Sequence, residues 1–345
     1  MPERDGNGRR IRRRLFLAAK IAVSAGLMAW ILSRADLAAV MDALAGVSPG
    51  WLVLAVVLQF TGSVLVTLRW RGLLAARGTE APFLFLYSSA LVAAFYRQFL
   101  PSIIGGDAIR GYDAWRAGAS PAAAALSLVV DRVLGLFALA LFAILAAAFA
   151  TGAAGALPGL ELWIAAATLA LCAAIAVLAG VLPPLSRDRA PRSGLAGKIA
   201  DKLLSIIDAL AAYRDARPAL WRGIGLSVVV QGLVIVFYWT LGQALGLGLP
   251  FVAYLSVVPI AIVVMMAPIT INGIGLREMI FVLLLGLWSV DEAAALAFAW
   301  LEFATFLAFG LFGGIVHALR PSGRIAPAEA MRGKMAGKMA GEAST

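Results

Sequence analysis

The sequence predicts an all-α polytopic membrane protein with about six transmembrane helices plus two re-entrant helical hairpins in an inverted repeat. Hydrophobic residues make up 62% of the 345 residues and charged residues only 14%, whereas soluble domains are about half apolar and about a quarter charged. The mean hydropathy is +0.92. Several uninterrupted apolar runs are long enough to cross a hydrocarbon core of about 30 Å. The composition and the runs together exclude a soluble enzyme domain.

The basic residues that give the chain its positive net charge lie where a membrane topology would place them. The formal net charge is +10 and the pI is near 10.3, but the charges lie in tails and loops that flank apolar runs, so no nucleic-acid partner is expected. Cys172 and His317 are the single cysteine and the single histidine. Because one cysteine cannot close a disulfide and no Cys/His cluster exists, neither a metal site nor a cofactor is expected.

The apolar runs predict the spans, and the basic residues predict their orientation. The basic stretch before the first run indicates a retained span rather than a signal peptide, because no small-residue cleavage site precedes a soluble domain. Lysine and arginine concentrate on the cytoplasmic side, so both termini are expected there, in a bacterial-type inner (plasma) membrane. Arg69, Arg71 and Arg77 obey the same rule after the second span. The predicted spans lie near residues 15–33, 51–68, 122–150, 160–182, 223–246 and 293–317.

Two interrupted apolar segments predict re-entrant hairpins. Residues 83–116 begin and end on the cytoplasmic side, and residues 251–292 begin and end outside. A complete span at 251–271 is the alternative, but the run 279–290 would then have to return with only about half a bilayer of helix. The order span, span, hairpin, span therefore occurs twice with opposite orientation. Such paired broken segments mark the binding site in many transporters.

The same order divides the chain into parts. We expect a membrane domain whose halves meet between the third and fourth spans, with an amphipathic helix at 195–213 along the inner membrane surface. The expected parts are a basic cytoplasmic tail (1–14), the membrane domain (15–318, with halves about 15–150 and 160–318 and a cytoplasmic loop 183–222 inside the second half), and a disordered cytoplasmic tail (319–345).

The first hairpin carries a dense polar motif, FLPSIIGGDAIR. Pro101 ends a helix, and the pair Gly105 and Gly106 permits a tight turn, so the next helix is expected to start after the pair. Asp107 and Arg110 then lie one helical turn apart. A helix N-terminus beside an arginine suits an anion such as phosphate. The alternative is a cytoplasmic loop in which the aspartate caps a helix and the arginine follows the charge rule.

The second hairpin carries a comparable motif, APITINGIGLREMIF. Asn272 and Gly273 break the helix, and Arg277 and Glu278 follow at the start of the next one. An ionisable pair in a re-entrant segment is costly unless it faces protein, water or ligand. Substrate contact and a structural arginine–glutamate pair that holds the hairpin both remain open.

Further ionisable residues lie inside predicted spans. Asp131 and Arg132 lie nearer the cytoplasmic end of the third span, where the arginine pairs with Asp107, lines a cavity, or joins an internal salt bridge that fixes helix packing. Glu302 lies deep in the last span and is expected to face the bundle, because it cannot easily reach the interface.

Three ordered motifs, FLPSIIGGDAIR, SLVVDRVLGL and NGIGLRE, resemble the flippase-like integral-membrane family that includes the transmembrane half of lysylphosphatidylglycerol synthase. The resemblance covers about residues 15–318. Members are implicated in moving modified phospholipids between leaflets, and others accompany glycolipid, isoprenoid-linked or hopanoid pathways. Many members have asparagine shortly before the proline, where this chain has Arg97 and Gln98. Because only a short tail follows the last span in place of a soluble aminoacyl-transferase domain, synthase chemistry is not expected.

The expected function is translocation of an anionic or modified lipid between leaflets, without enzyme activity. Arg110 and Arg277 are expected to contact the headgroup, while Asp107, Asp131 and Glu278 orient them or engage a basic moiety. No nucleotide-binding loop of Walker type occurs. The predicted substrate-binding residues are Gly105, Gly106, Asp107, Arg110, Asp131, Arg132, Asn272, Gly273, Arg277 and Glu278.

Two other functions stay open. A membrane-bound lipid-modifying enzyme would use the same three carboxylates as acid and base groups. A non-transporting scaffold would instead bind such an enzyme encoded separately. The expected partners are membrane lipids with an anionic headgroup, and a homo-oligomer is compatible with the sequence.

Overall fold

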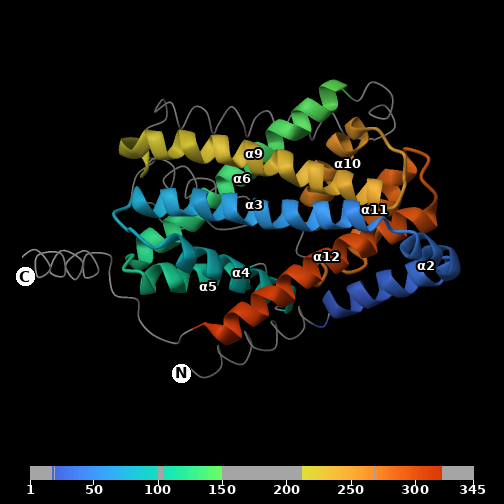
Figure 1. Ribbon diagram of the computed structural model, residues 1–345, viewed down its shortest axis with the longest axis horizontal. Helices are drawn as coiled ribbons and strands as arrows, with labels where there is room; N and C mark the ends of the chain where they lie inside the picture. The colour runs from blue at the N-terminus through green and yellow to red at the C-terminus, as the bar shows by residue number, and fades with distance from the viewer. Residues whose placement is uncertain (1–17, 19, 100–103, 150–211, 267–268, 321–345) are drawn as a thin grey trace, which may run out of the picture.

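The computed structural model describes residue 18 and residues 20–99, 104–149, 212–266 and 269–320. Within these residues the chain is helical and contains no strand, which confirms the predicted all-α class. A first helix contains Lys20–Leu32. The labelled helices of Figure 1 are α2 (Leu37–Ala45), α3 (Pro49–Ala75), α4 (Phe83–Phe99), α5 (Ile104–Arg116), α6 (Pro121–Phe149), α9 (Arg217–Ala244), α10 (Phe251–Met265), α11 (Leu276–Gly286) and α12 (Glu292–Leu319), with a short 3-10 helix at Arg214–Ala216 before α9.

Five of the six predicted spans correspond to described helices. The helices α3, α6, α9 and α12 are each long and apolar enough to cross a membrane. A fifth candidate is the pair Lys20–Leu32 and α2, which is bent by 88°. The predicted span 160–182 and nearly all of the predicted helix 195–213 lie outside the described residues. The described part is thus a multi-pass helical membrane protein.

An aspartate caps the start of two helices, α2 and α12. The Asp36 carboxylate accepts hydrogen bonds from the backbone N–H groups of Ala38 and Ala39 at the start of α2. The Asp291 carboxylate accepts one from Ala294 N at 2.9 Å at the start of α12. Both satisfy amide groups that have no partner inside the helix.

Each interrupted segment forms two helices that pack on each other, α4 with α5 and α10 with α11. The helix α10 has 15 residues, so it is about 22 Å long at about 1.5 Å per residue. This is shorter than a hydrocarbon core of about 30 Å. The length therefore favours a hairpin over a complete span at 251–271.

Helix packing follows the predicted inverted repeat. The second spans of the two halves, α3 and α9, pack along each other, and Figure 1 shows them side by side. The first helix of each hairpin packs on the last span of the other half, α4 on α12 and α10 on α6. These two contacts are equivalent under exchange of the halves, so the packing agrees with the repeat.

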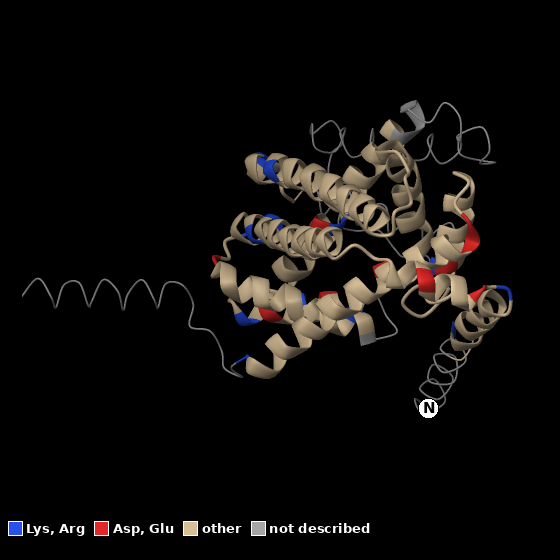
Figure 2. Ribbon diagram, turned by 45° about the vertical axis from the view of Figure 1, so that its right-hand side comes forward, with Lys and Arg blue, Asp and Glu red and all other residues tan. Residues whose placement is uncertain are grey.

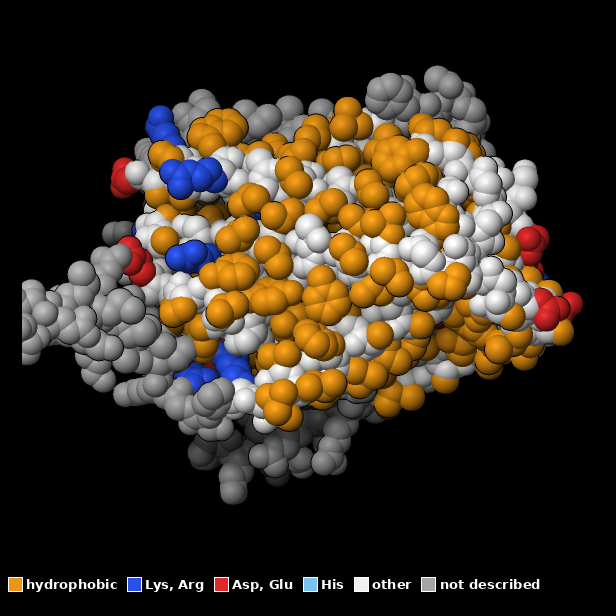
Figure 3. All heavy atoms as spheres, viewed as in Figure 1, with side chains coloured by type: hydrophobic (Ala, Val, Ile, Leu, Met, Phe, Trp, Pro, Cys, Tyr) orange, Lys and Arg blue, Asp and Glu red, His pale blue; other side chains and the backbone are white. Residues whose placement is uncertain are grey.

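The outer surface is apolar in its middle, and the second half has an aromatic core. Hydrophobic side chains cover the centre of the face in Figure 3, and charged side chains gather at its two ends. Figure 2 shows that other charged residues lie within the bundle. The largest apolar cluster joins α9, α10, α11 and α12. At its centre the rings of Phe281 and Phe298 meet edge to face at 5.1 Å, a favourable aromatic geometry.

Candidate functional site

The first polar motif lies on a helix that begins earlier than predicted. The helix α5 starts at Ile104, so Gly105 and Gly106 belong to its first turn, as does Asp107. The expectation of a glycine turn with a helix starting after Gly106 was wrong. A Cβ at Gly106 would lie 2.7 Å from the carbonyl oxygen of Ala93 in α4. Here the missing side chain permits close packing of two helices, a requirement that α4 imposes from outside the motif.

Four predicted site residues form one ion-pair network, which is buried at Asp131 and Arg110, half-buried at Asp107 and exposed at Arg132. Asp131 accepts hydrogen bonds from Arg69 Nε at 2.7 Å and from Arg110 Nη2 at 3.0 Å. Asp107 pairs with Arg132 and lies 3.8 Å from Arg110 Nη1. Asp131, Arg110 and Arg69 are each at most 7% exposed. Two consecutive polar residues of α6 thus bind the polar motif of α5 through two separate ion pairs.

Arg69 is the member of this network that the sequence did not assign to the site. It donates to Ser227 Oγ of α9 at 2.7 Å, so the network joins α3, α5, α6 and α9. The guanidinium of Arg110 also lies 4.4 Å from the ring centroid of Trp70, the neighbour of Arg69. No local signal separates Arg69 from Arg71 and Arg77, because all three fit the cytoplasmic charge rule.

The second polar motif forms a separate buried network. Arg277 Nε lies 2.9 Å from Glu302 Oε2, and Arg277 Nη2 donates to the Asn272 carbonyl oxygen at 2.9 Å. Glu278 instead accepts from the backbone N–H of Gly275 at 2.7 Å and caps α11. The arginine of this hairpin therefore pairs with α12 rather than with its own neighbour. Glu302 is 3% exposed and faces the bundle, as the sequence predicted.

The helix break before α11 consists of residues whose types tolerate positive φ angles. Asn272, Gly273 and Gly275 have positive φ angles of 51°, 79° and 80°, a region that glycine and asparagine adopt most readily. A Cβ at Gly275 would also lie 2.6 Å from Leu27 Cβ in the first helix. The predicted helix break at this motif is confirmed.

The two hairpins contact each other at their breaks. Asn272 Nδ2 in the second hairpin donates to Gln98 Oε1 at the end of α4, at 2.6 Å. This contact brings residues 174 positions apart in sequence together. The two motifs are neighbours in space, although each arginine belongs to its own network.

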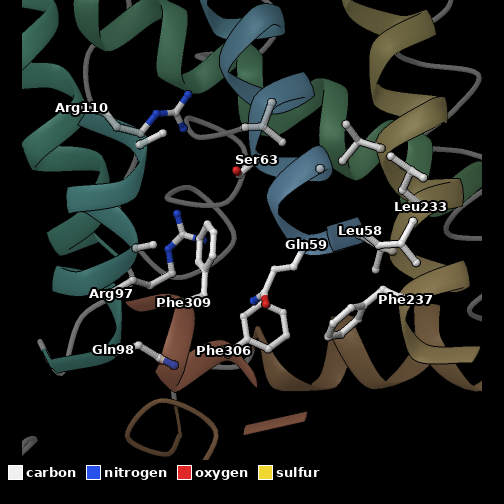
Figure 4. Close-up of a pocket in the computed structure, with 16 residues that line it drawn as sticks. Leu58, Gln59, Ser63, Arg97, Gln98, Arg110, Leu233, Phe237, Phe306 and Phe309 are labelled. Carbon is white, nitrogen blue, oxygen red and sulfur yellow. The ribbon is translucent and has the colours of Figure 1, made fainter. Parts of the chain in front are cut away.

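A cavity of about 280 Å³ lies beside the first network, between α3, α4, α9 and α12. Its charged side chains, Arg97 of α4 and Arg110 of α5, lie on one side, whereas Leu233 and Phe237 of α9 lie on the opposite side (Figure 4). Of the predicted site residues, Arg110 alone lines it. Its lining residues are Leu58, Gln59, Gly62, Ser63, Val66, Ala90, Ala94, Arg97, Gln98, Arg110, Val230, Leu233, Val234, Phe237, Phe306 and Phe309.

Both halves of the predicted repeat contribute walls to this cavity, α3, α4 and α5 from the first and α9 and α12 from the second. The fold and the cavity define a polytopic helical membrane protein with paired hairpins, an arrangement found among transporters. A family model described as "Lysylphosphatidylglycerol synthase TM region" matches residues 17–314. The chain belongs to this family, which confirms the resemblance and supports a role related to membrane lipids. The curated proteins include no match to the chain.

Proposed function

We propose that this protein moves an anionic or modified lipid between the two leaflets of the membrane. The observation that carries the proposal is the cavity, which both halves enclose and which is polar at one end and apolar at the other. A headgroup that crosses a bilayer loses its water, and hydrogen-bond donors in a protein cavity offset that loss.

The two networks have different roles in this proposal. Arg110 lines the cavity, and the carboxylates of Asp131 and Asp107 hold its side chain in place. Arg277 does not line the cavity and pairs with Glu302, so we assign it to positioning the second hairpin. Rocking of one half against the other around the cavity would expose it to each leaflet in turn.

The contacts of the carboxylates favour transport over lipid chemistry. Asp107 and Asp131 bind arginines, and Glu278 caps α11. None of the three lines the cavity. An acid or base group has to reach the reacting atom within hydrogen-bond distance, so a catalytic role for these three residues has no support in the geometry.

A cavity-filling variant tests the proposal. Gly62 lines the cavity, and a Cβ there would meet no atom within 4 Å, so a leucine side chain can start from this position and take up cavity space. Gly72 on the same helix has equally open surroundings and does not line the cavity, which makes Gly72→Leu the matched control. Dithionite quenching of fluorescent phosphatidylglycerol in proteoliposomes measures lipid movement.

We expect the wild type and Gly72→Leu to move the lipid at equal rates and Gly62→Leu to move it at least about tenfold more slowly. All three proteins should elute as a single peak in gel filtration before reconstitution. A wild type no faster than empty liposomes, or an unimpaired Gly62→Leu, would contradict translocation through this cavity.

A further inference from the structure

The polar groups that line the cavity are mainly hydrogen-bond donors. No aspartate or glutamate is among the lining residues. Three buried side-chain nitrogens of lining residues have no hydrogen-bond partner within the described part of the chain: Gln59 Nε2, Gln98 Nε2 and Arg110 Nε. Because an unsatisfied buried donor is costly, this wall matches a ligand rich in acceptors.

Of the two arginines that line the cavity, Arg97 is the one without a carboxylate in ion-pair distance among the described residues. It is exposed although it lies between helices, and its guanidinium points into the cavity (Figure 4). Within the described residues it forms no ion pair, whereas its neighbour Arg110 lies within 4 Å of both Asp131 and Asp107. A Cβ at Gly106 would lie 3.5 Å from Arg97 Nε, so the side chain lies against the first turn of α5. The positive end of that helix dipole adds attraction for an anion.

The second hairpin orients one further donor. The hydrogen bond from Asn272 Nδ2 occupies Oε1 of Gln98. The same Nδ2 lies 3.5 Å from the Gln98 carbonyl oxygen, so both of its near neighbours are acceptors. This leaves the NH₂ group of Gln98, a donor with no protein partner among the described residues, on the cavity wall beside Arg97.

The opposite wall suits hydrocarbon. Leu233, Val234 and Phe237 of α9 line it, and Phe306 and Phe309 of α12 lie between this wall and Arg97 (Figure 4). A volume of about 280 Å³ is just below the roughly 300–1,000 Å³ that ligand pockets occupy. It is enough for a headgroup and the first part of its chains, while the remaining hydrocarbon stays in the membrane.

We propose that the cavity binds the phosphate group of a phospholipid, with Arg97 as the residue that contacts the phosphate oxygens and Gln98 as a second donor. The hydrocarbon lies toward α9. An arginine binds phosphate through paired charge-assisted hydrogen bonds. The inference deepens the proposed function by naming the chemistry of the cargo, and the binding is measured without transport.

Titration of the purified full chain in a neutral maltoside detergent, followed by microscale thermophoresis, tests the inference. The probes are dioctanoyl phosphatidylglycerol, dioctanoylglycerol without phosphate, and glycerol phosphate without chains. We expect the phospholipid to bind at least about tenfold more tightly than either other probe. Arg97→Gln should weaken its binding at least about tenfold, and Arg97→Lys should weaken it less. Arg71→Gln, an exposed arginine of α3 outside the cavity, is the matched control and should bind as the wild type does.

Unchanged phospholipid affinity in Arg97→Gln would overturn the inference, and so would glycerol phosphate binding as tightly as the phospholipid, which would indicate a soluble anion. If Arg97→Gln does not elute as a folded protein, Leu233→Trp decides instead. It fills the apolar end and should weaken phospholipid binding at least about tenfold, and unchanged affinity would overturn the inference. The two proposals can fail separately. If phospholipid binding depends on Arg97 but the wild type moves no lipid in proteoliposomes, translocation is rejected and the phosphate-binding inference stands.

Discussion

Asp131→Asn should destabilise the protein more than any ordinary surface substitution. The Asp131 carboxylate is 2% exposed and bonds Arg69 at 2.7 Å and Arg110 at 3.0 Å. Asparagine keeps the shape but removes the charge. Arg110 then retains the Asp107 carboxylate at 3.8 Å, while Arg69 loses its carboxylate partner and keeps only neutral acceptors such as the Ser227 hydroxyl. Leaving a buried charge without its partner costs about 3–5 kcal/mol.

Thermal unfolding in detergent, followed by loss of the monodisperse gel-filtration peak, measures this effect. A change of about 1 kcal/mol shifts Tm by roughly 2–4 °C in domains of a few hundred residues, so we expect a decrease on the order of 10 °C. Asp215→Asn is the control, because Asp215 is exposed and such substitutions change stability by about 0.5 kcal/mol or less.

A second variant separates lost charge pairing from lost packing. Asp131→Leu combined with Arg69→Met removes both charges and should recover part of the stability lost in Asp131→Leu, because Arg69 is then no longer a buried charge without a carboxylate, while Arg110 still has Asp107 at 3.8 Å. If Asp131→Asn unfolds within about 2 °C of the wild type, or the double variant recovers nothing, the network does not hold α3, α5 and α6 together, and the reasoning fails.

Two further predictions concern helix packing and pH. A Cβ at Gly313 would lie 2.0 Å from the Leu91 carbonyl oxygen, so Gly313→Ala should force α12 from α4 and cost about 1–3 kcal/mol; Gly72→Ala, with open surroundings, is the control, and equal thermal shifts would contradict the contact. Tyr213 donates to the Leu73 carbonyl oxygen, and burial raises the pKa of its hydroxyl to about 12. The protonated hydroxyl of Tyr213 contributes fully to the free energy of unfolding below the unfolded pKa of about 10, and this contribution is lost as the pH rises to about 12. Between these pH values the free energy of unfolding of the wild type should therefore fall by about 2 kcal/mol more than that of Tyr213→Phe. Denaturant unfolding measures both proteins across this pH range, and an equal loss of stability in the wild type and in Tyr213→Phe would contradict the prediction.

Hydropathy predicted the spans well because the bilayer imposes a length. A helix that crosses the hydrocarbon needs about 20 apolar residues, and α3, α6, α9 and α12 all satisfy this requirement. The breaks were predictable for a similar local reason. Asn272, Gly273 and Gly275 adopt positive φ angles that few other residues tolerate.

The prediction failed where a residue's role depends on a distant segment. Gly105 and Gly106 have the composition of a turn, but they lie in the first turn of α5 because α4 requires close contact at Gly106. The Arg277–Glu278 dipeptide resembles an ion pair, but Arg277 reaches Glu302 on another helix. Neither outcome follows from local spacing, because the partner lies outside the motif.

The sequence alone determined that the chain is a helical membrane protein, that a helix breaks at Asn272 and Gly273, and that Asp107, Arg110, Asp131 and Arg277 belong to its polar clusters. The tertiary structure decided which of those residues are paired. The sequence assigned Arg110 to the site and left out Arg69 and Arg97, but Arg69 and Arg110 both bind Asp131 while Arg97 faces the cavity without an ion pair among the described residues. The energy of a charge depends on its distance to a partner and on its burial, and Arg69 and Asp131, 62 residues apart in sequence, meet only because α3 packs on α6.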